Sequence, residues 1–383
     1  MTPASRLDSV QEYYFSTKLK EIASLNANGK NILNLGIGSP DLAPSAATIE
    51  ALTLSAQNPK NHAYQSYVGV PALREAFAQW YEKYFRVRLN PTNEILPLLG
   101  SKEGIMHISM TYLETGDQVL VPNPGYPAYR SAGLLAGATI VEYNLAEQND
   151  WLIDFEELEA KDLTKVKLMW VNYPNMPTGA KANKAFFERL VAFGKKHNLL
   201  IVNDNPYSFI LNTDYLSILN VEGAMEVAME LNSLSKSQNM AGWRVGMLAG
   251  KAEYLADVLR FKSNMDSGMF LPLQQAAVKA LQNPPEWYAQ VNQIYGQRQQ
   301  KVFELLNHLQ CVYDPAQTGM FVWAKIPEKY ASGYELSDHV LYNANVFITP
   351  GGIFGSQGNG YVRISLCADV SLFEQALLRV RGN

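Results

Sequence analysis

The sequence predicts an α/β fold in which a mainly parallel sheet is flanked by helices, with a smaller α+β unit beside it. Short apolar runs alternate with helical patterns through the middle of the chain, and shorter strand candidates follow towards the C-terminus. Strands that alternate with helices form parallel sheets covered on both faces. Ligands of such sheets bind at the carboxyl ends of the strands, where we therefore expect the chemistry.

The main sheet has four candidate strands, at 118–121, 167–172, 199–204 and 228–234. Between the second and the third, residues 183–197 carry apolar side chains at spacings of three and four. This spacing indicates a helix with one buried face.

The C-terminal part of the chain predicts the smaller unit. A helical stretch from 285 to about 309 precedes strand candidates at 320–324, 346–349 and 361–366. Glycine-rich turns separate the last two candidates. The N-terminal stretch is the segment that we expect to pack with this unit.

The composition excludes several classes of protein. The chain has 383 residues, of which 47% are hydrophobic and 18% are charged, as is typical of globular proteins. Its 32 basic and 36 acidic residues give a net charge of −4, too even for a surface that binds nucleic acid. No uncharged apolar stretch is long enough for a membrane span. Nucleic acid and membranes are therefore not expected partners.

The cysteines and histidines predict neither a disulfide framework nor a metal site. Cys311 and Cys367 form no CxxC pair, which suits a reducing compartment, so we expect a cytoplasmic protein. The five histidines have no metal-ligand spacing. We expect them to be structural or solvent-exposed: His62, His107, His197, His308 and His339.

The strongest chemical signal is Ser-Leu-Ser-Lys at 233–236, followed by Gly-Trp-Arg-Val-Gly. Lys236 follows a buried strand candidate, and a desolvated lysine can act as a Schiff-base nucleophile. Ser233, Ser235 and Arg244 offer two hydroxyls and a guanidinium, which are groups expected around a phosphate. A lone lysine beside a turn is usually a surface residue, but this ordered set favours a functional site.

Other candidates follow neighbouring strands and turns. Asp204 ends an apolar run, where a carboxylate needs a positive partner, and Tyr207 could lie near it. An aspartate in such a place is also a common helix cap or turn residue. Gly100 and Ser101 precede a helical pattern and could form an anion site, although many helices begin with serine.

Two proline-rich loops and one arginine complete the set. The loops are Pro-Asn-Pro-Gly-Tyr-Pro-Ala-Tyr at 122–129 and Asn-Tyr-Pro-Asn-Met-Pro-Thr-Gly at 172–179. Arg363 lies in an alternating strand pattern. Its guanidinium could hold a carboxylate at two points, although exposed strand arginines are more common.

In this order, the segments resemble the class I/II pyridoxal-phosphate aminotransferases of the aspartate aminotransferase fold type. The resemblance extends from about Leu33 to Leu366. It implies an enzyme that moves an amino group between an α-amino acid and a 2-oxo acid, with pyridoxal 5′-phosphate held by a lysine as an internal aldimine. The motifs that carry it are Tyr64 with Gly69 and 73–74, 100–102, 124–126, 174–179, Asp204 with Tyr207, 233–236 with Arg244, and Arg363.

The resemblance also implies a role for each matching residue. Lys236 would hold the cofactor and shuttle the substrate proton, Asp204 would pair with the pyridine nitrogen, and Tyr207 would bind the phenolic oxygen. Further cofactor contacts would come from Gly100, Ser101, Lys102 (through its backbone N–H), Tyr126 (stacked on the ring), Ser233, Ser235 and Arg244. The substrate α-carboxylate would lie between Gly38 and Arg363.

The family also implies a homodimer and a division into two domains. Tyr64 would reach the cofactor phosphate of the neighbouring subunit, so that the active sites are shared. Residues 46–285 would form the large cofactor-binding domain, and residues 1–45 and 286–383 would form the small domain from both chain ends.

One position departs from the family pattern. The family usually has an asparagine immediately before Pro-Thr-Gly, and its amide also bonds the phenolic oxygen. This chain has Met176 there, a thioether without a donor. Either Asn175 supplies the bond or the oxygen depends on Tyr207 alone.

The residues leave the substrate and part of the chemistry open. Alternatives are a lyase of the same fold that catalyses β-elimination and, less favoured, a non-catalytic ligand-binding protein. A dicarboxylate substrate needs a second cation, for which Arg130 and Lys262 are candidates. Aromatic residues would instead line a neutral pocket, which we slightly favour: Tyr13, Tyr14, Phe15 and Phe270.

Overall fold

The computed structural model describes residues 1–10 and 14–382. Its centre is a seven-stranded sheet with the order β2-β8-β7-β6-β5-β3-β4. Strand β8 runs antiparallel to both of its neighbours, and the other neighbouring pairs are parallel. The predicted α/β fold with a mainly parallel sheet is confirmed. The strands are β2 (Ile95–Leu98), β3 (Gln118–Asn123), β4 (Thr139–Asn144), β5 (Val166–Val171), β6 (Leu200–Asp204), β7 (Ala228–Ser233) and β8 (Gly246–Gly250).

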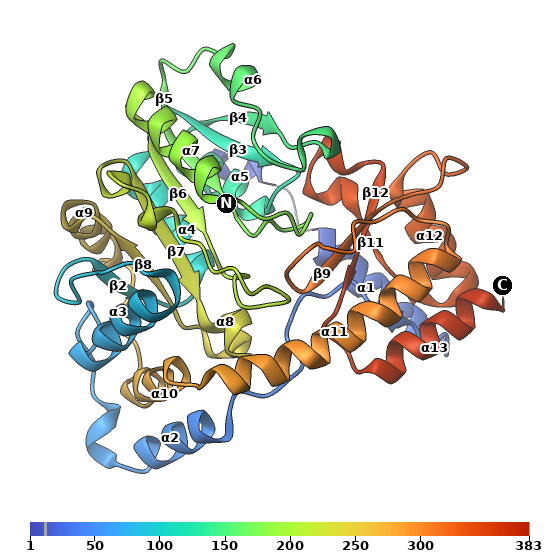
Figure 1. The fold of residues 1–383 in the computed structure, drawn as a ribbon, viewed down its shortest axis with the longest axis horizontal. Helices are drawn as coiled ribbons and strands as arrows, with labels where there is room; N and C mark the ends of the chain where they lie inside the picture. The colour runs from blue at the N-terminus through green and yellow to red at the C-terminus, as the bar shows by residue number, and fades with distance from the viewer. Residues whose placement is uncertain (11–13, 383) are drawn as a thin grey trace.

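Successive residues of the inner strands face opposite sides of the sheet, and both sides are buried. Ile201 belongs to one hydrophobic cluster, while its neighbours Leu200 and Val202 belong to another. This alternation explains why the strands are nearly continuous apolar runs rather than alternating patterns. The ribbon shows helices on both faces of the sheet (Figure 1).

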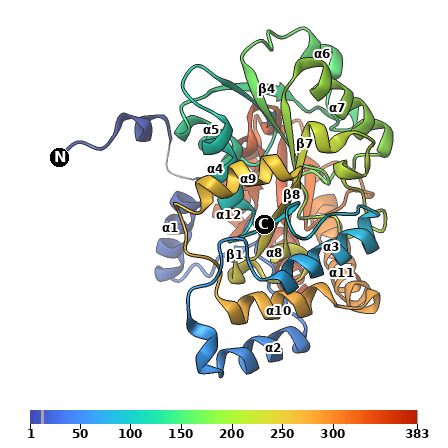
Figure 2. The ribbon, with the colours of Figure 1, turned by 90° about the vertical axis from the view of Figure 1, so that its left-hand side faces the viewer.

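The two helical layers come from different parts of the chain. The first hydrophobic cluster includes residues of α3 (Pro71–Phe85), α7 (Lys184–His197) and α10 (Leu271–Leu281). The cluster on the other face includes residues of α4 (Ser101–Tyr112), α5 (Pro127–Leu135) and α9 (Ala252–Lys262). Helix α2 (Ala46–Ala56) lies beside α10 in both views (Figures 1 and 2). The short helices are α6 (Phe155–Glu159) and α8 (Leu234–Ser237).

Helix α7 matches the predicted helix at 183–197. The side chain of Asn183 accepts a hydrogen bond from the backbone N–H of Phe186 and so caps the first turn. Asn198, in the left-handed conformation, ends the helix. Its buried residues are those of the predicted apolar face, including Phe186, Leu190 and Phe193.

A second group of elements lies on one side of the large sheet (Figure 1). Strands β9 (Phe321–Lys325), β11 (Thr349–Pro350) and β12 (Tyr361–Ser365) form an antiparallel sheet, and β1 (Leu33–Asn34) pairs in parallel with β10 (Val346–Phe347). The predicted strand at 346–349 is therefore two short strands, because its halves pair with different partners. The helices here are α1 (Tyr14–Ala27), α11 (Pro285–His308), α12 (Gly333–Ala344) and α13 (Val370–Arg381).

Both chain ends contribute to this second group. Leu33 and Leu35 pack in one hydrophobic cluster with residues of β9, β12 and α13. Helix α11 contacts both cores, since Tyr288 belongs to the first cluster and Tyr295 to the second. The division into domains at residues 46 and 285 stays a prediction, and its second boundary would lie at the first residue of this helix.

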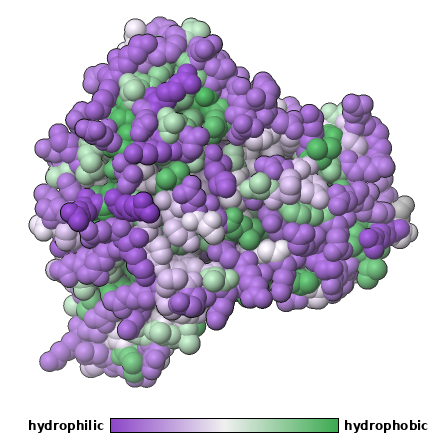
Figure 3. All heavy atoms as spheres, viewed as in Figure 1, coloured by the Kyte–Doolittle hydropathy of each residue, from purple (hydrophilic) through white to green (hydrophobic). Residues whose placement is uncertain are grey.

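The outer surface is mostly hydrophilic on the face shown in Figure 3, where apolar residues are exposed in small separate areas. Tyr64 is a large aromatic residue that is 91% exposed, and Met265 and Phe270 are also exposed. Within residues 1–10 and 14–382, no helix has the length and the apolar character that crossing a bilayer requires.

Candidate active site

A cavity of about 540 Å³ lies where the carboxyl ends of the main strands meet the second group of elements. Strand β6 ends at Asp204, β7 ends at Ser233, and α4 begins at Ser101 after β2. Eleven of the predicted site residues line it: Gly38, Ser101, Lys102, Tyr126, Asp204, Tyr207, Ser233, Ser235, Lys236, Arg244 and Arg363. Elements far apart in the sequence therefore converge on one site.

Asp204 is a buried carboxylate at the cavity wall. Tyr129 donates a hydrogen bond to its Oδ2 over 2.9 Å, and Asn172 donates to its backbone carbonyl. Oδ1 is buried without a well-formed hydrogen bond. Burial raises the pKa of Asp204 to about 6, while the hydroxyls of Tyr129 and Ser101 act in the opposite direction. Such a carboxylate needs a cationic or N–H partner from the cavity.

Lys236 follows β7 in the short helix α8 and reaches the cavity. Its Nζ donates to the backbone carbonyl of Gly38 over 2.6 Å. Burial lowers the pKa of Lys236 to about 8; Cys367 opposes this shift, and the positive charges of Arg363 and Arg244 add to it. A lysine with this pKa is partly neutral near physiological pH and can act as a nucleophile.

Three serines and an arginine form an anion cup. Ser101 opens the twelve-residue helix α4, whose N-terminal N–H groups favour a bound anion. Arg244 lies 3.3 Å from the Ser235 hydroxyl through Nη1, and Ser233 accepts from the backbone N–H of Ser235. Gly100 (φ 89°) lies directly behind the cup, where a Cβ would collide with the Arg244 guanidinium.

Arg363 is held in an aromatic enclosure on the opposite wall. Its guanidinium carbon lies 4.0 Å from the ring centre of Phe321, 4.6 Å from that of Phe354 and 5.7 Å from that of Phe15. Nη2 donates to the Gly36 carbonyl, and Nη1 lies 3.4 Å from the Met176 sulfur. These contacts fix the plane of a buried guanidinium, as carboxylate recognition requires.

Two tyrosines complete the predicted wall. Tyr126 precedes α5 and meets Tyr129 edge to face, with ring centres 5.6 Å apart. The ring of Tyr207 lies 5.9 Å from that of Phe321. Burial raises the pKa of Tyr207 well above its ordinary value, so its hydroxyl remains a donor at physiological pH.

Three predicted site residues do not line the cavity. The Nδ2 of Asn175 donates to the Asn172 carbonyl and its Oδ1 accepts from Thr178, so its amide is bonded within its own loop and its contact with the cofactor stays a prediction. Gly100 lies behind Arg244. Tyr64 points to the outside and has no described neighbour from this cavity, so its role stays a prediction that requires a second subunit.

Several residues that line the cavity were not predicted from the sequence. Tyr129 lies three residues after Tyr126, a helical spacing that could have placed both on one side. Asn172 directly follows β5, as Asp204 ends β6, so its place at the end of a strand was a usable signal. The other missed wall residues include Phe15 (named before only as a neutral-pocket candidate), Leu19, Ile37, Ser39, Phe321 and Phe354.

The candidates for a second substrate cation lie elsewhere. Arg130 pairs with Glu142 on the outside, and Lys262 pairs with Asp266. Phe270 is exposed beside His62, Tyr14 does not line the cavity, and Tyr13 lies outside the described residues.

Comparison with known proteins agrees with this geometry. Residues 30–379 match the family model for class I and II aminotransferases. An LL-diaminopimelate aminotransferase of Dehalococcoides mccartyi (strain BAV1) is 39% identical over 100% of this chain and 99% of its own length. The substrate-bound structure of BacF from Bacillus subtilis superposes with a TM-score of 0.94 at 36% identity, covering 100% of this chain and 97% of that one.

A more distant structure shows the fold alone. An aspartate aminotransferase double mutant of Thermus thermophilus gives a TM-score of 0.92 at 23% identity, over 100% of this chain and 99% of its own. The family model confirms the predicted resemblance over residues 30–379. The chain belongs to the class I and II aminotransferases, and it is an aminotransferase of a family whose members depend on pyridoxal phosphate.

Proposed function

We propose that this chain binds pyridoxal 5′-phosphate in the cavity and transfers the amino group of an α-amino acid to a 2-oxo acid. The observation that carries this is the pairing of an anion cup with a buried carboxylate and a lysine of lowered pKa on one cavity wall. The anion cup suits the phosphate, and the open Oδ1 of Asp204 suits the protonated pyridine nitrogen. When bound, the cofactor supplies an electron sink for the substrate carbanion.

Each wall residue then has a definite task. Asp204 would hold the ring nitrogen in its protonated form, and Tyr207 would donate to the phenolic oxygen. Lys236 would accept and return the proton of the substrate Cα. Arg363 binds the substrate α-carboxylate through parallel N–H donors.

We further propose that the amino donor is LL-diaminopimelate, because a relative that matches the full chain carries the name LL-diaminopimelate aminotransferase. The apolar wall of Phe15, Leu19 and Ile37 suits the hydrocarbon middle of this substrate. Lys102 also lines the cavity, and its positive charge suits the distal carboxylate. The same apolar wall also favours a second candidate, a donor with a neutral side chain.

Substitution of Lys102 separates the two donors. If LL-diaminopimelate is the donor, Lys102→Gln should lower its kcat/KM by about tenfold, the effect of one charge-assisted hydrogen bond. The same variant should leave kcat/KM for leucine and methionine unchanged. Wild-type activity with the neutral donors and none with LL-diaminopimelate would establish the second candidate instead.

We also propose a homodimer with shared active sites. Tyr64 is 91% exposed and lies close in sequence to the exposed Tyr67, which supports a partner surface at this segment. Sedimentation of the purified protein tests the dimer directly.

The two cysteines, both free, support a reducing, cytoplasmic setting.

A further inference from the structure

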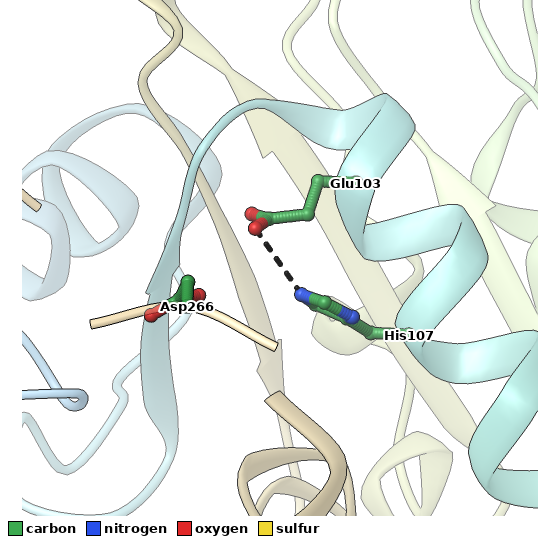
Figure 4. Close-up of side chains that lie close together, drawn as sticks. All are labelled: Glu103, His107 and Asp266. Atoms are coloured by element: carbon green, nitrogen blue, oxygen red, sulfur yellow. Dashed lines mark ion pairs between the residues drawn. The ribbon is translucent and has the colours of Figure 1, made fainter. Parts of the chain in front are cut away.

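Four charged or titratable side chains form a buried group next to the first turns of α4. Glu103 and His107 lie one turn apart on this helix, with Oε1 of Glu103 3.2 Å from Nε2 of His107. Both project towards Asp266, which follows α9 (Figure 4). Lys262 is the last residue of α9, and its Nζ lies 2.9 Å from Oδ2 of Asp266. We call these four residues the ionic cluster.

The ionic cluster is almost closed to solvent. His107 has no exposed side-chain surface, Lys262 has 3%, and Asp266 has 9%. The ring of Phe261 covers His107, with ring centres 5.5 Å apart. Buried charges persist when they are paired, and here Lys262 pairs with Asp266 while Glu103 lies against His107.

The composition of the ionic cluster also resembles a metal site. Ligand atoms of Glu103, His107 and Asp266 lie within 4.8 Å of one another, and carboxylates with an imidazole bind divalent cations. However, the Lys262 ammonium is within 3.0 Å of both oxygens of Asp266. It already supplies the positive charge there and would repel a divalent ion at short range in a buried site.

The ionic cluster holds the backbone of two functional segments. Glu103 accepts, through Oε2, a hydrogen bond from the backbone N–H of Leu99, which precedes the Gly100–Ser101 turn of the anion cup. Lys262 donates to the carbonyl of Tyr67 over 3.0 Å. The segment 64–67 begins with the exposed Tyr64. One cluster therefore fixes both the anion cup and the segment that carries Tyr64.

The chain after α9 strengthens the second of these connections. Asp266 accepts, through Oδ1, from the backbone N–H of Gly268 over 2.9 Å. Gly268 has a φ of +83°, and a Cβ there would collide with the carbonyl of Gln65. The backbone after Asp266 thus packs closely on the segment that carries Tyr64.

We propose that the ionic cluster is a positioning device that serves two active sites: Glu103 positions the anion cup of its own subunit, and the Lys262–Asp266 pair positions Tyr64 for the site of the partner. The proposal rests on the homodimer with shared sites proposed above. Glu103 would thus affect the site of its own subunit, and the Lys262–Asp266 pair would affect the site of the partner. A merely structural role would not separate the two effects in this way.

Hybrid dimers test these directions. Lys262→Met is combined with Asp266→Asn, so that no buried charge loses its partner. In the first hybrid, one subunit carries the double variant and the other subunit carries Lys236→Ala. The site that keeps Lys236 then receives Tyr64 from a subunit with an intact cluster. In the second hybrid, all three substitutions are in one subunit, so the wild-type site receives Tyr64 from the altered subunit.

Lys236 is labelled covalently with pyridoxal phosphate and borohydride at increasing cofactor concentrations. The amount of labelled Lys236 peptide is measured at each concentration. The reference is a hybrid of wild type with Lys236→Ala. We expect the first hybrid to match the reference and the second to need about tenfold more cofactor for half-maximal labelling, the loss of one charge-assisted contact. Equal concentrations in both hybrids would overturn the role of the pair in the partner site.

Glu103→Met in the same two arrangements should give the reverse pattern. We expect weaker labelling of the hybrid in which Glu103→Met is in the subunit that keeps Lys236. The hybrid in which Glu103→Met and Lys236→Ala are in the same subunit should match the reference. One divalent metal ion per wild-type subunit, lost in Asp266→Asn, would overturn the positioning device in favour of a metal site.

Failure of the proposed function gives a different result. A wild-type protein that is monomeric, or a Tyr64→Phe variant that labels like wild type, would overturn the shared site itself and the inference with it. A dimer with a Tyr64 effect but equal hybrids would overturn only the role of the ionic cluster.

Discussion

Tyr129 donates its phenolic hydrogen to Asp204 over 2.9 Å, and this bond ties helix α5 to the end of strand β6. The ring of Tyr129 stacks on Trp170 of β5, with ring centres 5.1 Å apart and planes 7° from parallel. The hydroxyl therefore has little freedom to leave the carboxylate. Asp204 is kept closer to its ionised form than burial alone would allow.

Tyr129→Phe should raise the pKa of Asp204 above 6, because the carboxylate loses a donor. One hydrogen bond to a charged group corresponds to about 1–2 pKa units. Pyridoxal phosphate should then bind more weakly at pH 7, with the loss shrinking at pH 8.5 as the carboxyl ionises. Equilibrium dialysis at the two pH values measures this. An equal loss at both would assign Tyr129 a packing role.

Asp204→Asn should stabilise the protein without cofactor at neutral pH. The folded pKa of Asp204 is about 6 and its ordinary value is 3.8, so between these pH values the folded state holds a proton that the unfolded state lacks. The free energy of unfolding of the wild type therefore falls as pH rises from about 4 to 6, by up to about 3 kcal/mol.

Urea unfolding at pH 4 and pH 7 tests this prediction. The stability difference between Asp204→Asn and wild type should be about 2–3 kcal/mol more favourable to the variant at pH 7 than at pH 4. Asp8→Asn, at an exposed position, should show no such dependence. A difference for Asp204→Asn that is the same at both pH values would contradict the buried, protonatable carboxyl.

Arg363→Lys should weaken substrates through their α-carboxylate, because an ammonium cannot reproduce a planar two-point contact. We expect kcat/KM to fall by roughly 2–3 kcal/mol in transition-state free energy. An amine donor without a carboxylate is the matched control and should be nearly unaffected. If kcat/KM falls equally for both donors, Arg363 stabilises the packing of its aromatic enclosure and does not bind the substrate.

Met176→Asn should shift the pH midpoint of the absorbance change of the bound cofactor downwards. An amide donor at this position would stabilise negative charge on the phenolic oxygen, so the proton shared with the lysine nitrogen would leave more easily. The expected shift is about one to two pH units. Asn175→Ala should leave the midpoint unchanged, because Asn175 is bonded within its own loop. A shift for Asn175→Ala alone would reverse these two roles.

The sequence could predict those site residues whose position follows from strand topology. Parallel strands bring their carboxyl ends to one edge, so Asp204 after β6 and Ser233 after β7 were expected together. Tyr207, close to Asp204 in the sequence, and Arg363, in a strand pattern, were candidates from the residues alone, and the resemblance to a known family implied the contact that each would make.

The remaining features depend on packing between distant segments. The bond from Tyr129 to Asp204 requires α5 to pack on the sheet so that the Tyr129 hydroxyl reaches the end of β6, and no spacing in the sequence encodes that packing. The direction of the Asn175 amide is set by the turn of its own loop. Glu103 and His107 have a readable spacing of one helical turn, but their partners Lys262 and Asp266 come from α9 and the segment after it.

The most direct test of the central claim is the absorbance of the cofactor-loaded enzyme during two half-reactions. An α-amino acid should bleach the absorbance band of the lysine-bound cofactor, and addition of a 2-oxo acid should restore it. Lys236→Ala should lack the starting band and should lose turnover by several orders of magnitude. Release of ammonia with no recovery by the 2-oxo acid, or substantial turnover of Lys236→Ala, would contradict an aminotransferase that acts through Lys236.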